Sequence, residues 1–267
     1  MIAQTLLLSG VPETMLWTLH ARASEHGTPN ALLRDERAAS LVQLIDCDFT
    51  AKFGAPNRLF AMRAALLDGA IRRWARRHPD GLVVSLGEGL ETQAWRVDNG
   101  RLRWLTIDLP DSIEARERFL NPSERFRHLA ADVTAPGWMS CVDATRGVFF
   151  VAQGLFMYLH PDQVERIFRG LAMHFPGADL AFDVVPRWLC EATCTPRAPE
   201  PGYILPPMPW GLDRHEIAPM LRRWHPGLKK LRFLPYRVPG RAPVRLAEWR
   251  DILFQRNTRP SLVQATL

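Results

Sequence analysis

The feature that most constrains the fold is a change of pattern at Gly81. Before this residue the apolar side chains recur at helical spacing, and after it short apolar runs alternate with helical patterns. That alternation is typical of a parallel α/β sheet. We therefore predict a doubly wound, mostly parallel sheet with a late reversed hairpin, built from seven strands at Leu82–Leu86, Leu102–Ile107, Phe126–Ala130, Gly147–Ala152, Leu180–Val185, Leu231–Tyr236 and Ile252–Gln255.

The first part of the chain reads as helical. Apolar residues at helical spacing run over Glu13–Glu25, Leu32–Asp46 and Asn57–Arg77, with a break at Gly27-Thr28-Pro29-Asn30. We expect residues 1–78 to form an N-terminal helical cap on an α/β core of residues 79–267, all in one integrated domain. Within the core, helical patterns cover Ile113–Leu120, Pro161–His174 and Arg214–Trp224.

A proline-rich insertion interrupts the core at about residues 186–212. It contains seven prolines together with Trp188, Tyr203 and Trp210. Long ordered segments of this kind are usually functional lids or linkers. Because the aromatic side chains favour packing, we predict a lid over a binding site.

The net charge is +6, from 34 Lys and Arg against 28 Asp and Glu. A basic chain suggests nucleic acid, and an RNA-binding or RNA-modifying protein is one alternative. However, the arginines are spread along the chain, and the short cluster at residues 72–77 ends a helix whose dipole it suits. We expect no nucleic-acid partner. There is also no apolar run near 18 residues, so we expect no membrane partner.

Cysteine usage indicates a reducing compartment. The four cysteines form no CxxC pair, and a chain of 267 residues needs no disulfide staples. Cys190 and Cys194 are four residues apart, but no nearby histidine completes a zinc set. We expect free thiols, no bound metal and a cytoplasmic location.

The clearest chemical signal is the segment VVSLGEGLETQAW. A buried strand runs into Gly87 and Gly89, which let the backbone approach a ligand, and a helix start follows. Thr92 occupies the third position of the dinucleotide fingerprint, so the NAD pattern is incomplete. Glu88 and Glu91 would repel a pyrophosphate but suit a cation. These residues favour S-adenosylmethionine, which carries a sulfonium and no phosphate.

Polar residues also follow the next three strands. Asp108 lies about 20 positions after the glycines, where a carboxylate holds ribose hydroxyls. Asp132 follows the third strand and could accept a hydrogen bond from an adenine amino group, and Gln153 follows the fourth. Open α/β sheets bind ligands beyond the carboxyl ends of their strands, so we expect these side chains to share one crevice.

These segments, in this order, resemble the leucine carboxyl methyltransferase superfamily, in the branch with polyketide O-methyltransferases. The resemblance runs from ETMLWTLHARASEHG through RAALLD, the glycine segment, WLTIDLPD, AADVTAPGW and VAQGLFMYL to MPWGLDRHEI and WHPGLKKL. It implies the Rossmann-like class I methyltransferase fold with S-adenosylmethionine as cosubstrate. It also implies that Arg63 pairs with the methionine carboxylate, Gly87 and Gly89 border the methionine part, and Gln153 faces its amino group. Asp108 would hold the ribose and Asp132 the adenine, with Leu109 and Val133 also among the cofactor-binding residues.

Two departures from the family pattern bear on the reaction. The family usually reads GLDTR where this chain reads GLETQ, and it usually has Glu at the position of Gln153. An amide stabilises an ammonium group less than a carboxylate does. One hypothesis is therefore that the substrate's own amine attacks its γ-carbon, giving azetidine-2-carboxylate and methylthioadenosine. The other is that Gln153 hydrogen-bonds an ordinary methyl donor.

The acceptor side offers weaker signals. Tyr158 and His215 are candidate bases, although the first could be a core residue and the second a capping group. Trp17, Tyr203 and Trp210 could contact the sulfonium through cation–π interactions or could simply pack. Our prediction is an S-adenosylmethionine-dependent enzyme that O-methylates a small molecule in secondary metabolism, as a monomer or homodimer.

Overall fold

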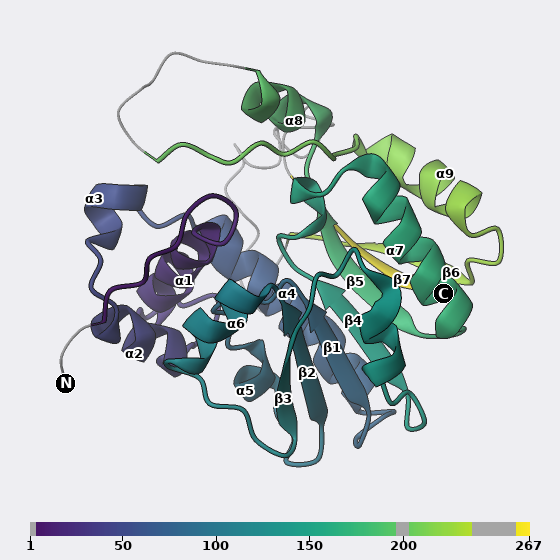
Figure 1. Ribbon diagram of the computed structural model, residues 1–267, viewed down its shortest axis with the longest axis horizontal. Helices are drawn as coiled ribbons and strands as arrows, with labels where there is room; N and C mark the ends of the chain where they lie inside the picture. The colour runs from purple at the N-terminus through teal and green to yellow at the C-terminus, as the bar shows by residue number, and fades with distance from the viewer. Residues whose placement is uncertain (1–3, 196–202, 237–259) are drawn as a thin grey trace.

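The computed structural model describes residues 4–195, 203–236 and 260–267, and they contain a seven-stranded sheet flanked by helices (Figure 1). The strand order is β3-β2-β1-β4-β5-β7-β6. The first five strands pair in parallel, and β7 pairs antiparallel with both β5 and β6. The strands are β1 (Leu82–Leu86), β2 (Arg103–Asp108), β3 (Phe126–Ala130), β4 (Val148–Ala152), β5 (Asp179–Val184), β6 (Lys230–Leu234) and β7 (Ser261–Thr266).

The predicted fold class is confirmed, and one strand of the sheet was not predicted. The expected strands at Leu82–Leu86 and Phe126–Ala130 coincide with β1 and β3. The expected strand at Ile252–Gln255 lies outside the described residues. The partner of β5 and β6 is instead Ser261–Thr266, whose pattern we did not recognise as a strand.

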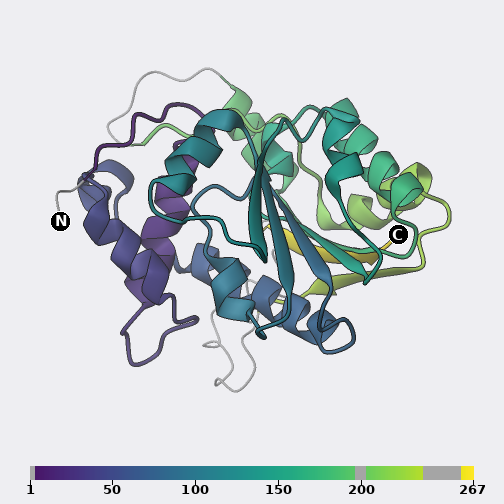
Figure 2. The ribbon, with the colours of Figure 1, turned by 60° about the horizontal axis from the view of Figure 1, so that its bottom comes forward.

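Helices cover both faces of the sheet, and turning the molecule shows α4 and α5 on one side and α7 and α9 on the other (Figure 2). Side chains of Asp35, Asp48 and Asn57 accept backbone N–H groups at the starts of α2, α3 and α4, as N-caps do. The α-helices are α1 (Thr14–Glu25), α2 (Glu36–Leu44), α3 (Phe49–Phe53), α4 (Arg58–Ala75), α5 (Gln93–Val97), α6 (Pro110–Glu117), α7 (Pro161–His174), α8 (Arg187–Cys194) and α9 (Arg214–Trp224), with short 3-10 helices η1 (Pro136–Cys141) and η2 (Phe156–Tyr158).

One face of the sheet packs against α4. Leu67, Ile71 and Trp74 of this helix form one buried cluster with Val83 of β1 and Phe149 of β4. We had placed this helix in the N-terminal cap, but its packing makes it a layer of the α/β sandwich. The helices that extend beyond the sheet are α1, α2 and α3, and we call these three helices the cap (Figure 1).

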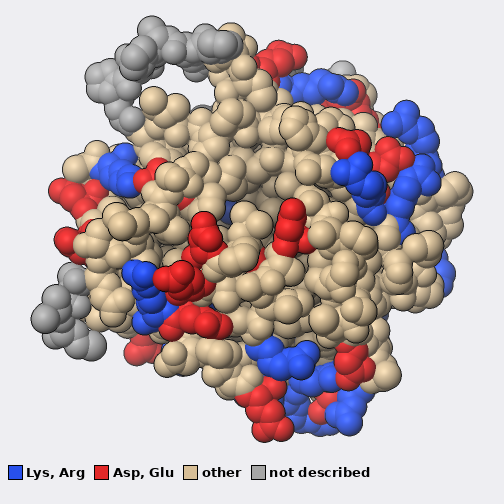
Figure 3. Space-filling model, viewed as in Figure 1, with Lys and Arg blue, Asp and Glu red and all other residues tan. Residues whose placement is uncertain are grey.

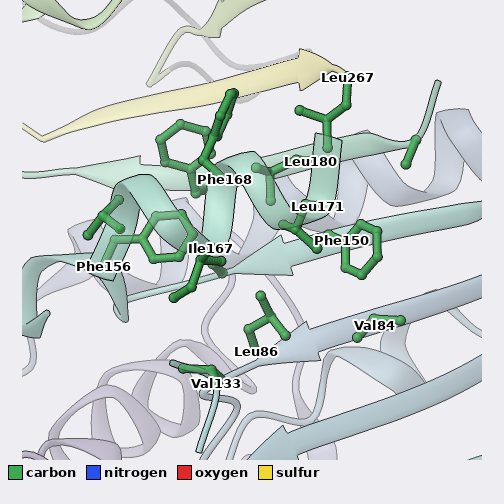
Figure 4. Packing of buried hydrophobic residues seen from close by; sticks show 14 of the residues in the cluster. Val84, Leu86, Val133, Phe150, Phe156, Ile167, Phe168, Leu171, Leu180 and Leu267 are labelled. Carbon is green, nitrogen blue, oxygen red and sulfur yellow. The ribbon is translucent and has the colours of Figure 1, made fainter. Parts of the chain in front are cut away.

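The opposite face carries the largest apolar cluster. Phe168 and Leu171 of α7 pack with Val84, Phe150 and Leu180 of the sheet (Figure 4). Alternate strand residues point to opposite faces, so Val83 and Val84 serve different clusters. In the described part of the chain, no helix has the length and apolar character that crossing a membrane would require.

Candidate active site

A cavity of about 710 Å³ lies at the carboxyl ends of the parallel strands. Its floor includes residues that follow β1, β2, β3 and β4, and its walls come from α1, α4 and α8. This volume falls within the range of small-molecule sites, which span about 300–1,000 Å³. On the face that carries α8 and α6, basic side chains lie around the margin while acidic and uncharged ones occupy the centre (Figure 3).

The loop after β1, residues 87–92, lines part of the cavity, and we call it the glycine loop. Gly87 and Gly89 have φ of 62° and 52°, the left-handed region that favours glycine. A Cβ at Gly87 would lie 2.7 Å from Leu155 Cδ1, and one at Gly89 would lie 2.8 Å from Met15 Cβ. Only glycine therefore fits at these two positions without strain.

Asp108 is fixed against this loop. Its Oδ2 accepts the Gly89 N–H at 2.7 Å, and its Oδ1 accepts the Leu109 N–H at 2.8 Å. Burial raises the pKa of the Asp108 carboxyl. The carboxylate lines the cavity at the end of β2, and its remaining lone pairs can accept hydrogen bonds from a ligand.

Asp132 and Val133 border the cavity beyond β3. Oδ1 of Asp132 accepts both the N–H and the hydroxyl of Thr134 at 2.8 Å, which fixes its direction. The Asp132 side chain is exposed, whereas Val133 is buried. Leu109, at 44% exposure, also lines the cavity. The structure thus brings all the residues of the predicted ribose and adenine set to one cavity wall.

Arg63 reaches the cavity from α4 and is held by an acid that we did not anticipate. Its Nη1 lies 2.6 Å from Oδ2 of Asp183, and both side chains are buried. The other oxygen of Asp183 accepts the Gly154 N–H at 2.6 Å. The Arg63 Nε has no partner among the described residues. The only sequence signal for Asp183 was a single acid inside the apolar run LAFDVV.

Gln153 presents an unpaired acceptor. Its Nε2 donates to Oε2 of Glu91 at 2.9 Å, while its Oε1 is buried without a hydrogen-bond partner in the described chain. A buried carbonyl oxygen without a partner is costly, so it marks a place where a ligand donor fits. Gln153 lines the cavity at the end of β4, as predicted.

The two glutamates of the loop are not free negative charges. Glu88 is buried and accepts hydrogen bonds from Trp104 and Thr106, and burial raises its pKa. Burial would also raise the pKa of Glu91, but the guanidinium groups of Arg22 and Arg96 outweigh it and lower this pKa to about 2. From the sequence we used Glu88 and Glu91 to favour a cationic cofactor, but both carboxylates already have protein partners and are not free to attract a sulfonium.

The acceptor-side candidates separate into two groups. Trp17 and Tyr158 line the cavity, and burial raises the pKa of the Tyr158 hydroxyl. Tyr203 does not line the cavity but packs edge-on against Phe53 at 4.7 Å and lies 5.9 Å from Trp17, measured between ring centroids. Tyr203 therefore packs near Trp17, which lines the cavity, without lining the cavity itself.

Two predicted residues lie away from the cavity. His215 is exposed in the first turn of α9, where Asp213 and Glu216 already form the capping box. Trp210 is 2% exposed and packs at right angles on Phe156, with 6.1 Å between centroids. His215 is thus not placed to act as a base, and Trp210 is a core residue.

Three more aromatic side chains complete the wall, and of these only Trp188 was named in the predicted lid. Phe60 packs edge-on against Trp17 at 4.7 Å and lies 5.3 Å below the Arg63 guanidinium. Trp188 of α8 and Tyr236 after β6 also line the cavity. Their positions follow from the packing of α4, α8 and β6 around the sheet, which local sequence patterns do not reveal.

Comparison with known proteins agrees with this arrangement. The sequence model of the leucine carboxyl methyltransferase family matches residues 15–172, more than half of the chain. The chain belongs to this family. It is accordingly an S-adenosylmethionine-dependent methyltransferase.

Individual relatives fit the same assignment. The tetracenomycin polyketide synthesis O-methyltransferase TcmP of Streptomyces glaucescens is 35% identical over 190 residues, covering 70% of each chain. The S-adenosyl-L-methionine-dependent methyltransferase dpfgK of Gibberella zeae is 29% identical over 187 residues, covering 63% of this chain and 62% of its own. A crystal structure from Thermobifida fusca YX, described as a methyltransferase, has a TM-score of 0.58 at 17% identity and covers 92% of this chain and 93% of its own.

Proposed function

We propose that this enzyme transfers a methyl group from S-adenosylmethionine to an oxygen atom of an apolar small molecule in secondary metabolism. The observation that carries the proposal is the two-sided cavity. Polar groups at the strand ends form one side, and aromatic and aliphatic side chains from α1, α4 and α8 form the other. The resemblance to an O-methyltransferase of polyketide synthesis supports an oxygen acceptor.

The residues of the polar side suit S-adenosylmethionine. Arg63 would pair with the methionine carboxylate, because its Nε has no partner among the described residues and Asp183 holds the guanidinium in place. Gln153 Oε1 would accept from the amino group, and Asp108 would accept from ribose hydroxyls. Leu109, Asp132 and Val133 would border the adenine. When bound, S-adenosylmethionine supplies an electrophilic methyl group.

The enzyme's own contribution is positioning and exclusion of water. The apolar wall desolvates the acceptor and aligns it with the polar side, which is the main requirement of an in-line displacement. Tyr158 lines the cavity with its pKa raised by burial, so its hydroxyl stays protonated at neutral pH. We therefore assign Tyr158 to orienting the acceptor oxygen by a hydrogen bond rather than to removing its proton.

The first test is calorimetric titration with S-adenosylmethionine. We expect Arg63→Met to weaken binding about 10- to 100-fold, the scale of one hydrogen bond to a charged group. Arg58→Met is the matched control, because Arg58 begins the same helix and pairs with Glu25 outside the cavity. Unchanged affinity of Arg63→Met, or absence of binding to the wild type, would contradict the proposal.

A second reaction is favoured by one observation, the amide at position 153. Gln153 offers Oε1 rather than a carboxylate to the amino group, so a neutral amine is held as readily as an ammonium. A neutral amine could attack the γ-carbon, forming a C–N bond and breaking the C–S bond. The products would be azetidine-2-carboxylate, whose ring nitrogen keeps both hydrogens of the amine and takes the positive charge, and methylthioadenosine, which leaves with the C–S electron pair.

Mass spectrometry of enzyme incubated with S-adenosylmethionine alone separates the two reactions. Methyl transfer predicts no turnover until an acceptor is added. Formation of methylthioadenosine together with azetidine-2-carboxylate, faster than in an enzyme-free blank, would establish the cyclisation instead. Gln153→Glu is the matched variant, because its carboxylate would hold the amine as an ammonium and suppress that product.

A further inference from the structure

A buried ionic cluster joins the cap to the glycine loop. Its side chains are at most 7% exposed, and each member contacts at least one other. With two cations and three anions, its members come from α1, α4, α5 and the segments before α2 and α5. We call the following residues the cap cluster: Arg22, Asp35, Asp68, Glu91 and Arg96.

Arg22 of α1 uses every nitrogen of its guanidinium within the protein. Nε lies 3.3 Å from Asp35 Oδ2, Nη1 lies 3.1 Å from Glu91 Oε2, and Nη2 donates to the Leu90 carbonyl at 2.8 Å. Arg22 is 1% exposed although it borders the cavity. Two of its three contacts, Glu91 and Leu90, are with the loop that follows β1, so Arg22 ties the cap to that loop.

Glu91 in turn decides how Gln153 lies. The amide Nε2 of Gln153 and the Nη1 of Arg22 both contact the same oxygen, Oε2 of Glu91. An ionised carboxylate accepts only, so it selects the NH₂ end of the amide and turns Oε1 the other way. A protonated Glu91 could donate to Oε1 instead, and the amide would then favour the flipped orientation.

We propose that Arg22 is a positioning residue, which acts through Glu91 to keep the Oε1 of Gln153 directed at the amino group of the bound methionine. The inference rests on the proposed cofactor contacts of Gln153. In this role Arg22, a side chain of the cap, takes part in cofactor recognition through Glu91 and Gln153. Docking of α1 and correct orientation of Gln153 are then one event.

The charge state of Glu91 gives a readout that simple destabilisation would not move. Burial raises its pKa, and Arg22 is the largest of the influences that bring it down to about 2. Without Arg22, burial is opposed only by the weaker influences of Arg96 and the Thr92 N–H, so this pKa rises toward the experimental range. Arg22 on α1 and Arg96 on α5 contact the Glu91 carboxylate. The other charged groups nearby are Asp35 before α2 and Asp68 on α4, which contact Arg96, Arg116 on α6, which donates to the Glu91 carbonyl, and Glu88 in the same loop.

The experiment measures the dissociation constant for S-adenosylmethionine by calorimetry between pH 5 and pH 7. Over this range the ligand's own α-amino group stays protonated. We expect the ratio of the Arg22→Met constant to the wild-type constant to grow about tenfold as the pH falls from 7 to 5. The double variant Arg22→Met/Glu91→Gln should bind weakly with a ratio that does not depend on pH.

Controls separate positioning from loss of structure. Arg22→Lys keeps the charge, so it should restore a ratio that is flat with pH even if affinity stays lowered. Arg58→Met removes an arginine at the start of α4 that pairs with Glu25 of α1, outside the cap cluster, and should also give a flat ratio. If Arg22→Met does not fold, Glu91→Gln alone must bind more weakly than the wild type, because a neutral amide at position 91 no longer selects one end of Gln153.

The outcomes distinguish this inference from the proposed function. A wild type that does not bind S-adenosylmethionine overturns the proposed function. A wild type that binds, with an Arg22→Met ratio that is flat with pH or an acid effect that persists in the double variant, overturns the role of Arg22 alone.

Discussion

The two interiors of this molecule are built on different physics. Between the sheet and its helices, residues such as Phe150, Leu171 and Leu180 are fully buried and apolar (Figure 4). Between the cap and the glycine loop, the buried groups include the charged side chains of Arg22, Asp35 and Arg96. Apolar packing tolerates small shifts, whereas paired charges are stable only in one geometry. The first interior holds the fold, and the second fixes the orientation of the site.

The largest effect should come from removing the central cation of the cap cluster. Arg96→Met leaves Asp35, Asp68 and Glu91 without a partner that all three contact. We expect a loss of about 3–5 kcal/mol in unfolding free energy, the usual cost of stranding a buried charge. Urea denaturation at neutral pH measures it.

The pH dependence of that loss sharpens the comparison. In the wild type the pKa of Glu91 falls from 4.5 to about 2 on folding, so its contribution is present above pH 4.5 and lost toward pH 2. Arg96→Met removes part of this contribution, so its deficit should shrink as the pH falls from 7 to 3. A deficit that stays constant would mean that the cluster acts as ordinary packing.

Truncation in the apolar interior should cost a similar or smaller amount without that pH signature. Leu180→Ala removes a fully buried side chain from β5 and should lower the unfolding free energy by about 2–5 kcal/mol. The deficit should be equal at pH 7 and pH 4. If urea denaturation gives the same pH profile for the deficits of Leu180→Ala and Arg96→Met, the two interiors are not distinct in this respect.

The glycine loop lies where the two interiors meet. Gly89→Ala places a methyl group in a left-handed conformation and 2.8 Å from Met15 Cβ of α1. We expect a loss of about 1–3 kcal/mol in unfolding free energy together with weaker binding of S-adenosylmethionine. Equal affinity in the variant, measured by calorimetry, would show that α1 can move without disturbing the site.

A surface ion pair provides the smallest effect. Arg103 pairs with Asp143 at 2.6 Å, with exposed fractions of 28% and 47%. Arg103→Met should lower the unfolding free energy far less than Arg96→Met, and added salt should reduce the ion-pair part of this effect. A loss as large as that of Arg96→Met would mean that burial is not what distinguishes the cap cluster.

Local patterns predicted much of the fold. Pro161–His174 is a helix with the bounds we expected, because its capping residues and apolar spacing are local signals. Ser261–Thr266 escaped us because its stability comes from pairing with β5 and β6, far away in the chain. Its mixed pattern SLVQAT carries little strand signal by itself.

The site divides in the same way. Residues that directly follow a strand, such as Asp108 and Gln153, could be placed from the sequence because parallel strands end at one edge. Asp183, which is 120 residues from Arg63, and Arg22, 13 residues from Asp35, gain their roles from tertiary contacts. The prediction that His215 acts as a base was wrong, because a lone histidine in the sequence does not show which side of its helix faces the site.

The position of β7 also has a consequence for biosynthesis. Since β7 lies between β5 and β6, the strand that carries Asp183 is an open sheet edge until residues 261–266 have left the ribosome. Open edges pair readily with other chains, and synthesis proceeds at about 5–20 residues per second. The parallel half of the sheet can assemble early on the ribosome, whereas the β5 edge beside the Arg63–Asp183 pair stays open until β7 is made.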